Sequence, residues 1–472
     1  MRAMPDLPET QLSVWSSMVE LASGRLSARE LVERCLQRIE DPAGEGRATF
    51  IEVYAREARA QADAVDALRA SGAPLPPLAG IPVSVKDLFD VAGSITAAGS
   101  RVLRSRPPAA RDATVVARLR AAGLILIGRT NMTELAYSGL GLNPHYGTPL
   151  NPFERTTRRI PGGSSSGAAI SVTDGMAAIG IGTDTGGSCR IPAAFTGIVG
   201  FKPTAYRVPR DGVAPLSTTL DSVGPLGQSV TDCAVLDAVL SDTAPAGAAL
   251  GRAAPPPAPF ALNGLRLLVP RNYVLDDLDT HVAATFERCA AALARAGALL
   301  TSAPFPELAR LPEINAKGNF SAAECYAEHR ELLESRRAEF DPRVAARIWK
   351  GREQTAADYI RLLAARAELL RSARALTASF DAVMMPTVPF IAPALQELEE
   401  DAAYHRANAL ALRNPAIANF LDRCAISVPV HRTGEAPVGL MLMGEHGADA
   451  KLFAIARSIE LLLSPHNSGA TG

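Results

Sequence analysis

The sequence predicts an α/β protein, and two patterns indicate this class. Short apolar runs typical of strands alternate with helical segments along most of the 472 residues. After a stretch rich in Ala, Pro and Gly near residues 241–262, the same alternation starts again. We expect that stretch to be an irregular surface linker. Length alone permits one large domain or two or three smaller ones.

Each element is predicted from its local periodicity. Helices are expected where apolar residues recur at helical spacing, and Ser27 is a suitable N-cap for the first long one. Strands are expected at short apolar or alternating runs. In chain order, the expected elements are a helical segment at 11–39, a strand at 81–85, a helix at 114–122, strands at 124–127, 176–181 and 265–269, a helix at 281–298, a mostly helical stretch at 319–377, and strands at 381–389 and 425–430.

The charge balance limits the kinds of partner. Lys and Arg number 48 and Asp and Glu number 49, so the net charge is −1. Such a balance provides no overall field that would attract nucleic acid or an anionic membrane. We therefore expect a small-molecule substrate and neither of those two partners.

The cysteines, histidines and N-terminus indicate location and cofactor use. The six cysteines contain no C-x-x-C pair, and the seven histidines are spread singly, so neither a disulfide framework nor a metal site is indicated. The N-terminus has no export pattern, and no apolar run approaches the ~18 residues of a membrane span. We expect a cytoplasmic protein without a metal or organic cofactor.

Two clusters rich in glycine and serine carry the strongest functional signal. GGSSSG covers residues 162–167, and GTDTGGS covers residues 182–188. Glycine lets successive backbone N–H groups converge on one point, which is what an oxyanion hole requires. A serine hydroxyl beside such a turn predicts a hydrolase of amide-like bonds.

Lys86 is the candidate base. It lies in PVSVKD, at the end of a predicted strand, where active-site groups of α/β folds gather. Burial there would lower the pKa of the lysine and make its neutral amine available. No histidine is near either cluster in the sequence, so a proton relay through lysine is favoured.

Two other interpretations of the clusters are possible. GGSSSG fits G-x-S-x-G with Ser165 at its centre, and His446 would then be the candidate triad histidine. However, a nucleophile elbow follows a strand, whereas residues 155–161 are polar, basic and end in proline. A phosphate-binding loop is set aside because neither cluster fits the nucleotide motifs.

The clusters and their surroundings resemble the amidase signature family of serine amidohydrolases. The matching segments include PVSVKD, PGGSSSGAA, GIGTDTGGSCRIPAAFTGIVGFKPT and SVGPLGQSVTD, and the likeness extends over almost the whole chain. It implies one α/β/α domain, residues 1–472, with a mixed central sheet flanked by helices. Many members read GGSSGGS where this chain reads GGSSSGA, but this departure leaves the triad positions intact.

The resemblance also implies the catalytic roles. Ser188 would be the nucleophile, Lys86 the base, and Ser164 the bridging serine after a cis peptide bond with Gly163. Ser164 would accept the proton of Ser188 while passing its own to neutral Lys86, and the reverse transfer would protonate the leaving nitrogen. The backbone N–H groups of Thr185, Gly186, Gly187 and Ser188 would form the oxyanion hole.

The substrate pocket is expected to be apolar. In similar proteins the segment 131–147 contributes to the acyl pocket, so Met132, Leu135 and Tyr137 are candidates, with Ile191 behind the nucleophile. Ordinary core packing explains each of these residues equally well. If they line the pocket, its only fixed positive charge would be Arg190, and we expect Asp184 to pair with it.

The predicted function is hydrolysis of small neutral amides, anilides or carbamates (urethanes) through an acyl-enzyme on Ser188. Two alternatives remain. One is the amidase subunit of an aminoacyl-tRNA amidotransferase, although that branch usually reads SIRQPA where this chain reads SCRIPA. The other is a catalytically silent binding protein of the same fold. Homodimers are common among similar proteins, but the sequence shows no interface.

Overall fold

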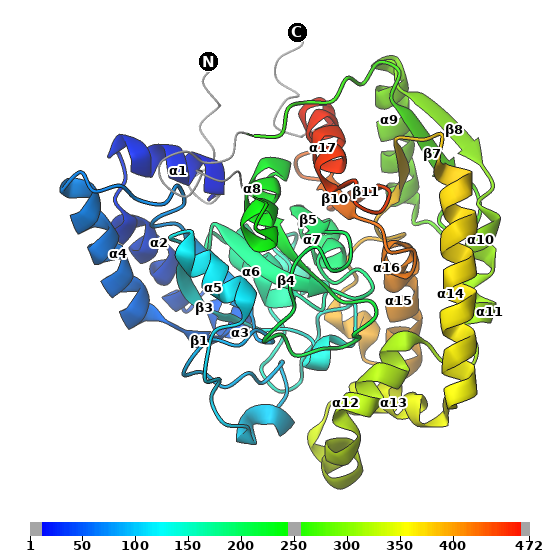
Figure 1. Ribbon diagram of the computed structural model, residues 1–472, viewed down its shortest axis with the longest axis horizontal. Coiled ribbons are helices and arrows are strands. Elements are labelled where there is room, and N and C mark those ends of the chain that lie inside the picture. Colours follow the sequence, from blue (N-terminus) through cyan, green and yellow to red (C-terminus); the bar gives the residue numbers. More distant parts are fainter. Residues whose placement is uncertain (1–11, 244–255, 464–472) are drawn as a thin grey trace.

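A central sheet of eleven strands organises the protein (Figure 1). The computed structural model describes residues 12–243 and 256–463. Across the sheet the strand order is β1-β3-β2-β4-β6-β5-β10-β11-β9-β7-β8. The strands are β1 Phe50–Val53, β2 Pro82–Lys86, β3 Ile125–Thr130, β4 Ile179–Asp184, β5 Val199–Lys202, β6 Ser222–Gly227, β7 Arg266–Pro270, β8 Leu299–Ala303, β9 Ala382–Pro386, β10 Ala425–Pro429 and β11 Gly439–Met443.

Helices surround the sheet and fill the connections between its strands. Several of them lie in the segment between β8 and β9, where α12, α13 and α14 extend along one side of the molecule (Figure 1). The helices are α1 Val14–Ser23, α2 Ala28–Glu40, α3 Gly46–Thr49, α4 Ala55–Ala70, α5 Thr114–Ala121, α6 Ser166–Thr173, α7 Arg190–Thr196, α8 Val230–Ser241, α9 Thr280–Arg295, α10 Pro306–Ala309, α11 Leu311–Ile314, α12 Phe320–Arg336, α13 Pro342–Trp349, α14 Ala356–Thr377, α15 Asp401–Arg413, α16 Ala416–Phe420 and α17 Asp449–Leu463.

The sheet is mixed, as the resemblance implies. β2 pairs in parallel with both β3 and β4, whereas β6 is antiparallel to β4 and β5. Helices cover both faces, which is visible in β5: Gly200 faces α7, and Val199 and Phe201 belong to the apolar cluster that includes α8 and α17. Because β2 and β4 are parallel neighbours, their carboxyl ends bring Lys86 and the loop after Asp184 to the same edge of the sheet.

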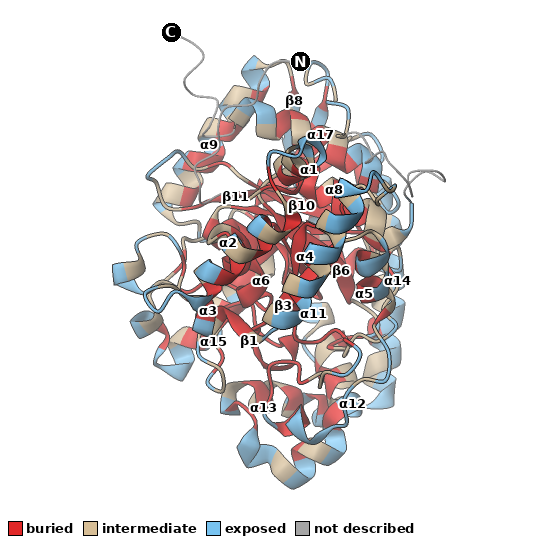
Figure 2. Ribbon diagram, turned by 90° about the vertical axis from the view of Figure 1, so that its left-hand side faces the viewer, coloured by how far each residue is buried: buried red, intermediate tan, exposed pale blue. Residues whose placement is uncertain are grey.

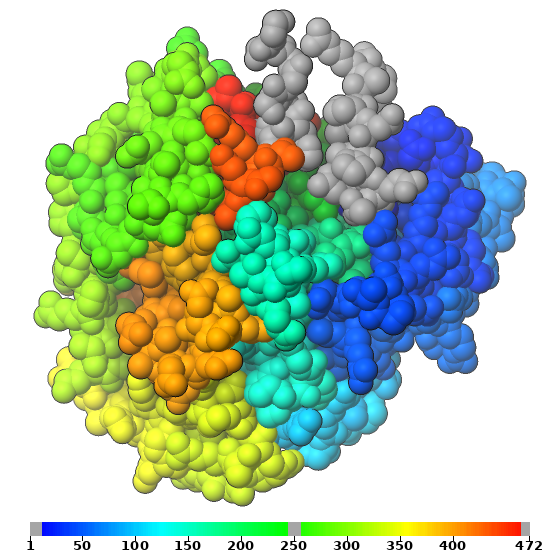
Figure 3. All heavy atoms as spheres, turned by 180° about the vertical axis from the view of Figure 1, so that it is seen from behind, coloured from blue at the N-terminus to red at the C-terminus, as the bar shows by residue number. Residues whose placement is uncertain are grey.

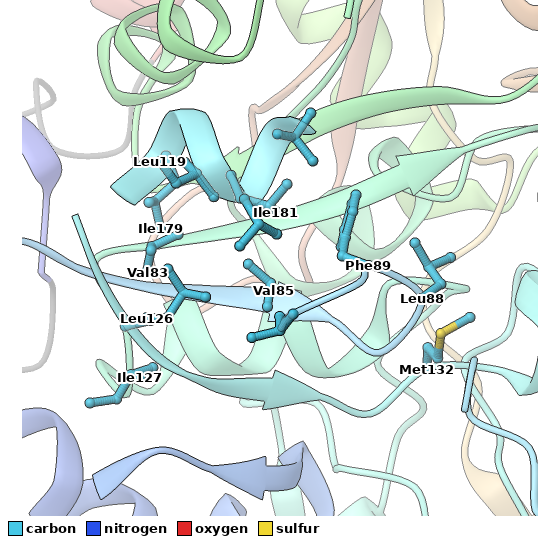
Figure 4. Close-up of a cluster of buried hydrophobic side chains, with 14 of the residues drawn as sticks. Val83, Val85, Leu88, Phe89, Leu119, Leu126, Ile127, Met132, Ile179 and Ile181 are labelled. Carbon is cyan, nitrogen blue, oxygen red and sulfur yellow. The ribbon is translucent and has the colours of Figure 1, made fainter. Parts of the chain in front are cut away.

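The buried core follows the strands. Figure 2 shows buried residues concentrated in the central sheet, with exposed residues on the outer surfaces of the helices. In Figure 4, Val83 and Val85 of β2 lie near Ile179 and Ile181 of β4, and Leu119 of α5 is in the same group. Both faces of these strands are covered, since all residues of β2 and β4 are buried.

The predicted elements are found at nearly the expected positions. Ser27 caps α2 in a capping box, in which its backbone N–H donates to Glu30 Oε2 at 2.9 Å. The strand expected at 176–181 starts later, at Ile179, because the amides of Met176 and Ala177 donate to Ser171 O at the end of α6. Part of the expected linker at 241–262 lies outside the described residues, and residues 256–262 form neither helix nor strand.

Segments distant in sequence pack together on the face shown in Figure 3. The region around residues 390–410 (orange) lies beside the region around residues 140–160 (cyan to green). Two contacts join them: the Ile160 amide donates to Pro393 O at 3.0 Å, and Arg159 Nη1 donates to Ala392 O at 2.8 Å. Leu412 and Pro415, which follow the first of these regions in the chain, lie beside Gly186 and Gly187 of the second glycine-serine cluster.

Candidate active site

Lys86 is fully buried at the carboxyl end of β2. Its Nζ donates to Ser164 Oγ at 2.8 Å and to Thr183 Oγ1 at 2.9 Å. Burial lowers the pKa of Lys86 to about 8. Near neutral pH this lysine therefore has a larger neutral fraction than an ordinary lysine, and the neutral form is the one that can act as a general base.

Ser164 and Ser165 are adjacent but point to different partners. The peptide bond between Gly163 and Ser164 is cis, and Ser164 Oγ faces Lys86. Ser165 Oγ donates instead to Thr183 O at 3.3 Å, and no strand leads into Ser165. His446 is largely exposed and contacts Asp422. This geometry does not match a nucleophile elbow at Ser165.

The position of Ser165 depends on a close approach of α6 to the sheet. α6 begins directly after Ser165, and its Ala168 packs on Gly180 of β4. A Cβ on Gly180 would lie 2.7 Å from Ala168 O, so only glycine permits this packing. The helix therefore holds the serine cluster against β4 and close to Lys86.

Ser188 lies in the loop between β4 and α7, in a position fixed by an ion pair. Arg190 Nη2 donates to Asp184 Oδ1 at 2.8 Å and Arg190 Nε donates to Asp184 Oδ2 at 3.0 Å, which confirms the expected pair. Burial disfavours ionisation of Asp184, but Arg190 outweighs it and holds the pKa of this carboxyl well below its usual range. Asn419 extends the network by donating to Asp184 O at 2.9 Å.

The amides of this loop differ in what they bind. The Gly187 amide donates to Asp184 Oδ1 at 2.8 Å, and the Cys189 amide donates to Asp184 Oδ2 at 3.1 Å. The expectation that Gly187 is an oxyanion donor is therefore corrected, because its N–H already has an anionic acceptor. In the described part of the chain, no acceptor takes the amides of Thr185, Gly186 or Ser188.

Thr185 is held by a carboxylate that belongs to none of the sequence motifs, that of Asp221. Its Oγ1 donates to Asp221 Oδ1 at 2.5 Å, and the amides of Leu216 and Ser217 both donate to Asp221 Oδ2 at 3.0 Å. Burial raises the pKa of Asp221 to about 6. Asp221 thus ties the loop after β4 to the segment before β6.

A cavity of about 430 Å³ opens beside Ser188. This volume is within the range of sites for small molecules. Thr185, Gly186 and Ser188 form one side of it, together with Tyr137. The rest of its lining is mainly apolar and includes residues of helices late in the chain, among them Phe320, Leu412, Ile417 and Phe420.

The four residues predicted to line the pocket are not all found there. Tyr137 lines the cavity, whereas Met132, Leu135 and Ile191 are not among its lining residues. Met132 is fully buried and lies in the cluster of apolar side chains in Figure 4. Ile191 is also fully buried and packs in another apolar cluster. For these three residues core packing accounts for the apolar character.

The charge in the cavity also differs from the expectation. Arg190, expected to be the only fixed positive charge, is buried in its pair with Asp184, and two other arginines, Arg347 and Arg413, line the cavity. Arg347 comes from α13 and Arg413 from the end of α15. Neither belongs to a recognisable motif, so no local signal in the sequence identifies them.

Two features bear on metals and membranes. In the described ranges, no group of three or more His, Cys, Asp or Glu side chains is arranged to hold a metal ion. Within the same ranges, no helix is long and apolar enough to span a bilayer.

Comparison with known proteins places this geometry in a family. The family model described as "Amidase" matches residues 30–453. The chain belongs to the amidase family. This amidase is 38% identical over 455 residues to 2-amino-5-chloromuconic acid deaminase of Comamonas testosteroni, with 96% of each chain covered. It is 34% identical to a glutamyl-tRNA(Gln) amidotransferase subunit of Symbiobacterium thermophilum, covering 94% of this chain and 96% of that protein.

A solved structure agrees with the sequence relatives. The amidase resembles a protein described as "Crystal structure of amidase" with a TM-score of 0.85 and 30% identity, covering 96% of this chain and 100% of that one. The α/β fold with a mixed central sheet is therefore confirmed, and so is the prediction of an amide-hydrolysing enzyme. The amidase is an amidohydrolase of the amidase signature type.

Proposed function

We propose that the amidase cleaves the C–N bond of small linear amides through an acyl-enzyme on Ser188, with Ser164 and Lys86 as the proton relay. The observation that carries this proposal is the buried lysine, whose Nζ lies 2.8 Å from Ser164 Oγ. Ser188 lines the cavity, and its carbonyl oxygen accepts a hydrogen bond from the Ser165 amide at 3.3 Å. The two serine segments are thus in direct contact.

In the proposed reaction, neutral Lys86 takes the proton of Ser164 as Ser164 takes that of Ser188. Ser188 Oγ then forms a bond to the carbonyl carbon of the substrate. When the C–N bond breaks, the same relay returns a proton to the leaving nitrogen. Water attacks the acyl-enzyme by the same route and releases the acid.

The oxyanion hole is assigned to the amides of Thr185, Gly186 and Ser188. These three N–H groups have no acceptor in the described part of the protein, unlike that of Gly187. Each donor to a developing oxyanion is typically worth about 3 kcal/mol of transition-state stabilisation. Asp221 supports this role because it fixes Thr185 through the hydroxyl group.

The proposed mechanism defines the class of C–N bond that is cleaved, and this class includes the C–N bond of carbamates. A carbamate carbonyl presents the same tetrahedral geometry to Ser188 as an amide, so urethane cleavage is included. The expectation of neutral substrates rested on a cavity without a free positive charge. Arg347 lines the cavity, so that premise does not hold. One relative is named for an acid substrate, 2-amino-5-chloromuconic acid, so anionic amides are also included.

The transamidating alternative has support from the relatives named as amidotransferase subunits. A free-standing hydrolase and a transamidating subunit differ in what they need. The hydrolase turns over substrate alone with water as the acceptor, whereas the subunit requires partner proteins for its reaction.

Activity-based labelling followed by a turnover screen tests the proposal. A fluorophosphonate should modify Ser188, and peptide mass spectrometry should locate the adduct there. The purified chain should then hydrolyse at least one compound among primary amides, p-nitroanilides and aryl carbamates. Absence of labelling at Ser188 would refute the acyl-enzyme, and labelling without any turnover would favour the transamidating subunit.

A further inference from the structure

Arg347 occupies a defined place in the wall of the catalytic cavity. It lies on α13, which starts at Pro342 with Asp341 as its N-cap, and the Asp341 amide donates to Glu134 Oε2 at 2.6 Å. Val344 and Ile348 of the same helix are fully buried. The start and the apolar face of α13 are thus anchored, and Arg347 lines the same cavity as Ser188.

The guanidinium of Arg347 is oriented but not neutralised. It stacks over the ring of Tyr137, with 4.4 Å between Cζ and the ring centroid. Its Nη1 is buried and has no hydrogen-bond partner, and within residues 12–243 and 256–463 Arg347 takes part in no ion pair. A buried N–H of a charged group without an acceptor is costly, and a ligand that supplies an acceptor removes that penalty.

The second arginine of the cavity differs in this respect. Arg413 Nη2 donates to the main-chain oxygens of Val274 at 3.4 Å and Asp276 at 2.6 Å, and Arg413 Nε donates to Asn414 Oδ1 at 3.1 Å. Both Nε and Nη2 of Arg413 therefore have acceptors from the protein. Of these two arginines, Arg347 is the one with a buried donor that has no acceptor.

An adjoining cavity of about 480 Å³ continues from Arg347. The two cavities share Tyr137, Asn315, Asn319 and Arg347, so Arg347 is one of the side chains at which they meet. Lys317 and Lys350 line the outer cavity together with one acidic residue, Glu353. The excess of positive groups on this side favours the approach of an anionic ligand.

We propose that Arg347 binds a carboxylate of the substrate, remote from the scissile C–N bond, and that the preferred substrates are small amides that carry a second acidic group. The planar guanidinium can donate paired hydrogen bonds to a carboxylate, which Lys cannot reproduce. The apolar wall with Phe320 and Leu412 would contact the carbon chain between the two groups. This inference rests on the proposed function, since it takes the carbonyl next to Ser188 as the reacting one.

Binding to an inactive variant tests the carboxylate site without turnover. Ser188→Ala protein is titrated calorimetrically with malonate, succinate, glutarate and adipate, and with the corresponding neutral diamides. At least one diacid should bind more tightly than its diamide. Adding Arg347→Gln should weaken that diacid by about 10- to 100-fold, the range for a charge-assisted hydrogen bond.

Arg352→Gln is the matched control in the same Ser188→Ala background. Arg352 is exposed, lines neither cavity and carries the same charge as Arg347. Its replacement should leave diacid affinity unchanged. If no diacid binds, the inference is overturned. It is also overturned if Arg352→Gln weakens binding as much as Arg347→Gln, because only general electrostatics would then act.

Turnover provides the second measurement. For the chain length that binds best, kcat/KM is compared between the half-amide, which bears a carboxylate, and the diamide. The half-amide to diamide ratio should fall by about 10- to 100-fold in Arg347→Gln and by less in Arg347→Lys, which keeps the charge but loses the planar fork. Because Arg347→Lys keeps the positive charge, it can replace Arg347→Gln as the test variant if the glutamine variant does not fold.

The two proposals fail in different ways. Fluorophosphonate labelling of Ser188 together with an unchanged half-amide to diamide ratio in both Arg347 variants would reject the carboxylate site and leave the amide hydrolase in place. Diacid binding that depends on Arg347, together with no labelling of Ser188, would reject the acyl-enzyme and leave the anion site in place.

Discussion

Lys86 Nζ donates to Ser164 Oγ across 2.8 Å, and this contact joins the end of β2 to the loop before α6. The same nitrogen donates to Thr183 Oγ1 of β4 at 2.9 Å. The lysine is thus surrounded by hydroxyl groups that accept from either form of the amine. Protonation of Lys86 is therefore governed mainly by burial.

We expect activity to rise with pH through one ionisation near 8. Burial disfavours the ammonium form and lowers the pKa of Lys86 to about 8, so the neutral amine is a minority below this pH and the majority above it. A profile of kcat/KM from pH 6 to pH 10 on a non-ionising anilide measures this midpoint. Thr183→Val removes an acceptor for the ammonium and should move the midpoint to lower pH. A profile that falls over this range would contradict a lysine base.

Lys86→Arg should be inactive on amides. A guanidinium stays protonated in proteins and has no lone pair to accept the proton of Ser164. We expect Lys86→Ala to be impaired at least as strongly on amides as on esters, since amide cleavage needs a proton delivered to the leaving nitrogen. Steady-state rates on a matched amide and ester measure this difference. An arginine variant with normal amide activity would eliminate the relay.

Alanine substitutions of Ser188 and Ser165 should distinguish the nucleophile from a serine that only lies near it. Ser188→Ala should lose turnover and fluorophosphonate labelling, because the attacking oxygen is removed. Ser165→Ala removes only a 3.3 Å hydrogen bond to Thr183 O and should keep most of the activity. Labelling and initial rates of both variants are the measurements. The opposite pattern, with Ser165 essential and Ser188 dispensable, would restore the elbow interpretation.

Thr185→Val should lower kcat and stability together. The substitution preserves the shape of the side chain but removes the hydroxyl that donates to Asp221, leaving this buried carboxyl with fewer donors. We expect a loss of about 1–3 kcal/mol in the free energy of unfolding, the usual consequence of removing one partner from a buried polar group. Thr185→Ser keeps the hydroxyl and should recover both properties. Denaturant unfolding measures the stability, and steady-state assays measure kcat. A valine variant with full stability and full rate would show that the contact between Thr185 and Asp221 is dispensable.

Gly186 and Gly187 should respond differently to alanine. Gly187 has a φ of +126°, and a Cβ there would lie 2.5 Å from Pro415 Cβ, so Gly187→Ala should distort the loop and lose activity. A Cβ on Gly186 would meet only Leu412 Cδ2 at 3.5 Å and Ala416 Cβ at 3.8 Å. Gly186→Ala should therefore fold with near-normal stability, as thermal denaturation would show. Equal destabilisation by both substitutions would contradict this account of the loop.

Several features of the site could be predicted from the sequence because they are local. The glycine-serine clusters specify tight turns beside serine hydroxyls, and the strand pattern of PVSVKD places Lys86 at the end of a strand. The pair of Asp184 with Arg190 is six positions apart and closes within one loop. Thr183, the second partner of Lys86, stands inside GTDTGGS, so its hydroxyl belongs to the same local motif.

The sequence by itself determined the strands, the serine clusters and the family, because each of these depends on residues close together in the chain. Only the tertiary structure decided what the cavity is made of. From the sequence, Met132 and Ile191 could equally be pocket or core residues, and the packing of the sheet and helices buries both of them. Arg347 reaches the cavity because α13 is anchored to Glu134, 207 positions away from Asp341 in the sequence. No local pattern encodes contacts over such a separation; they arise when apolar surfaces of distant segments are removed from water together.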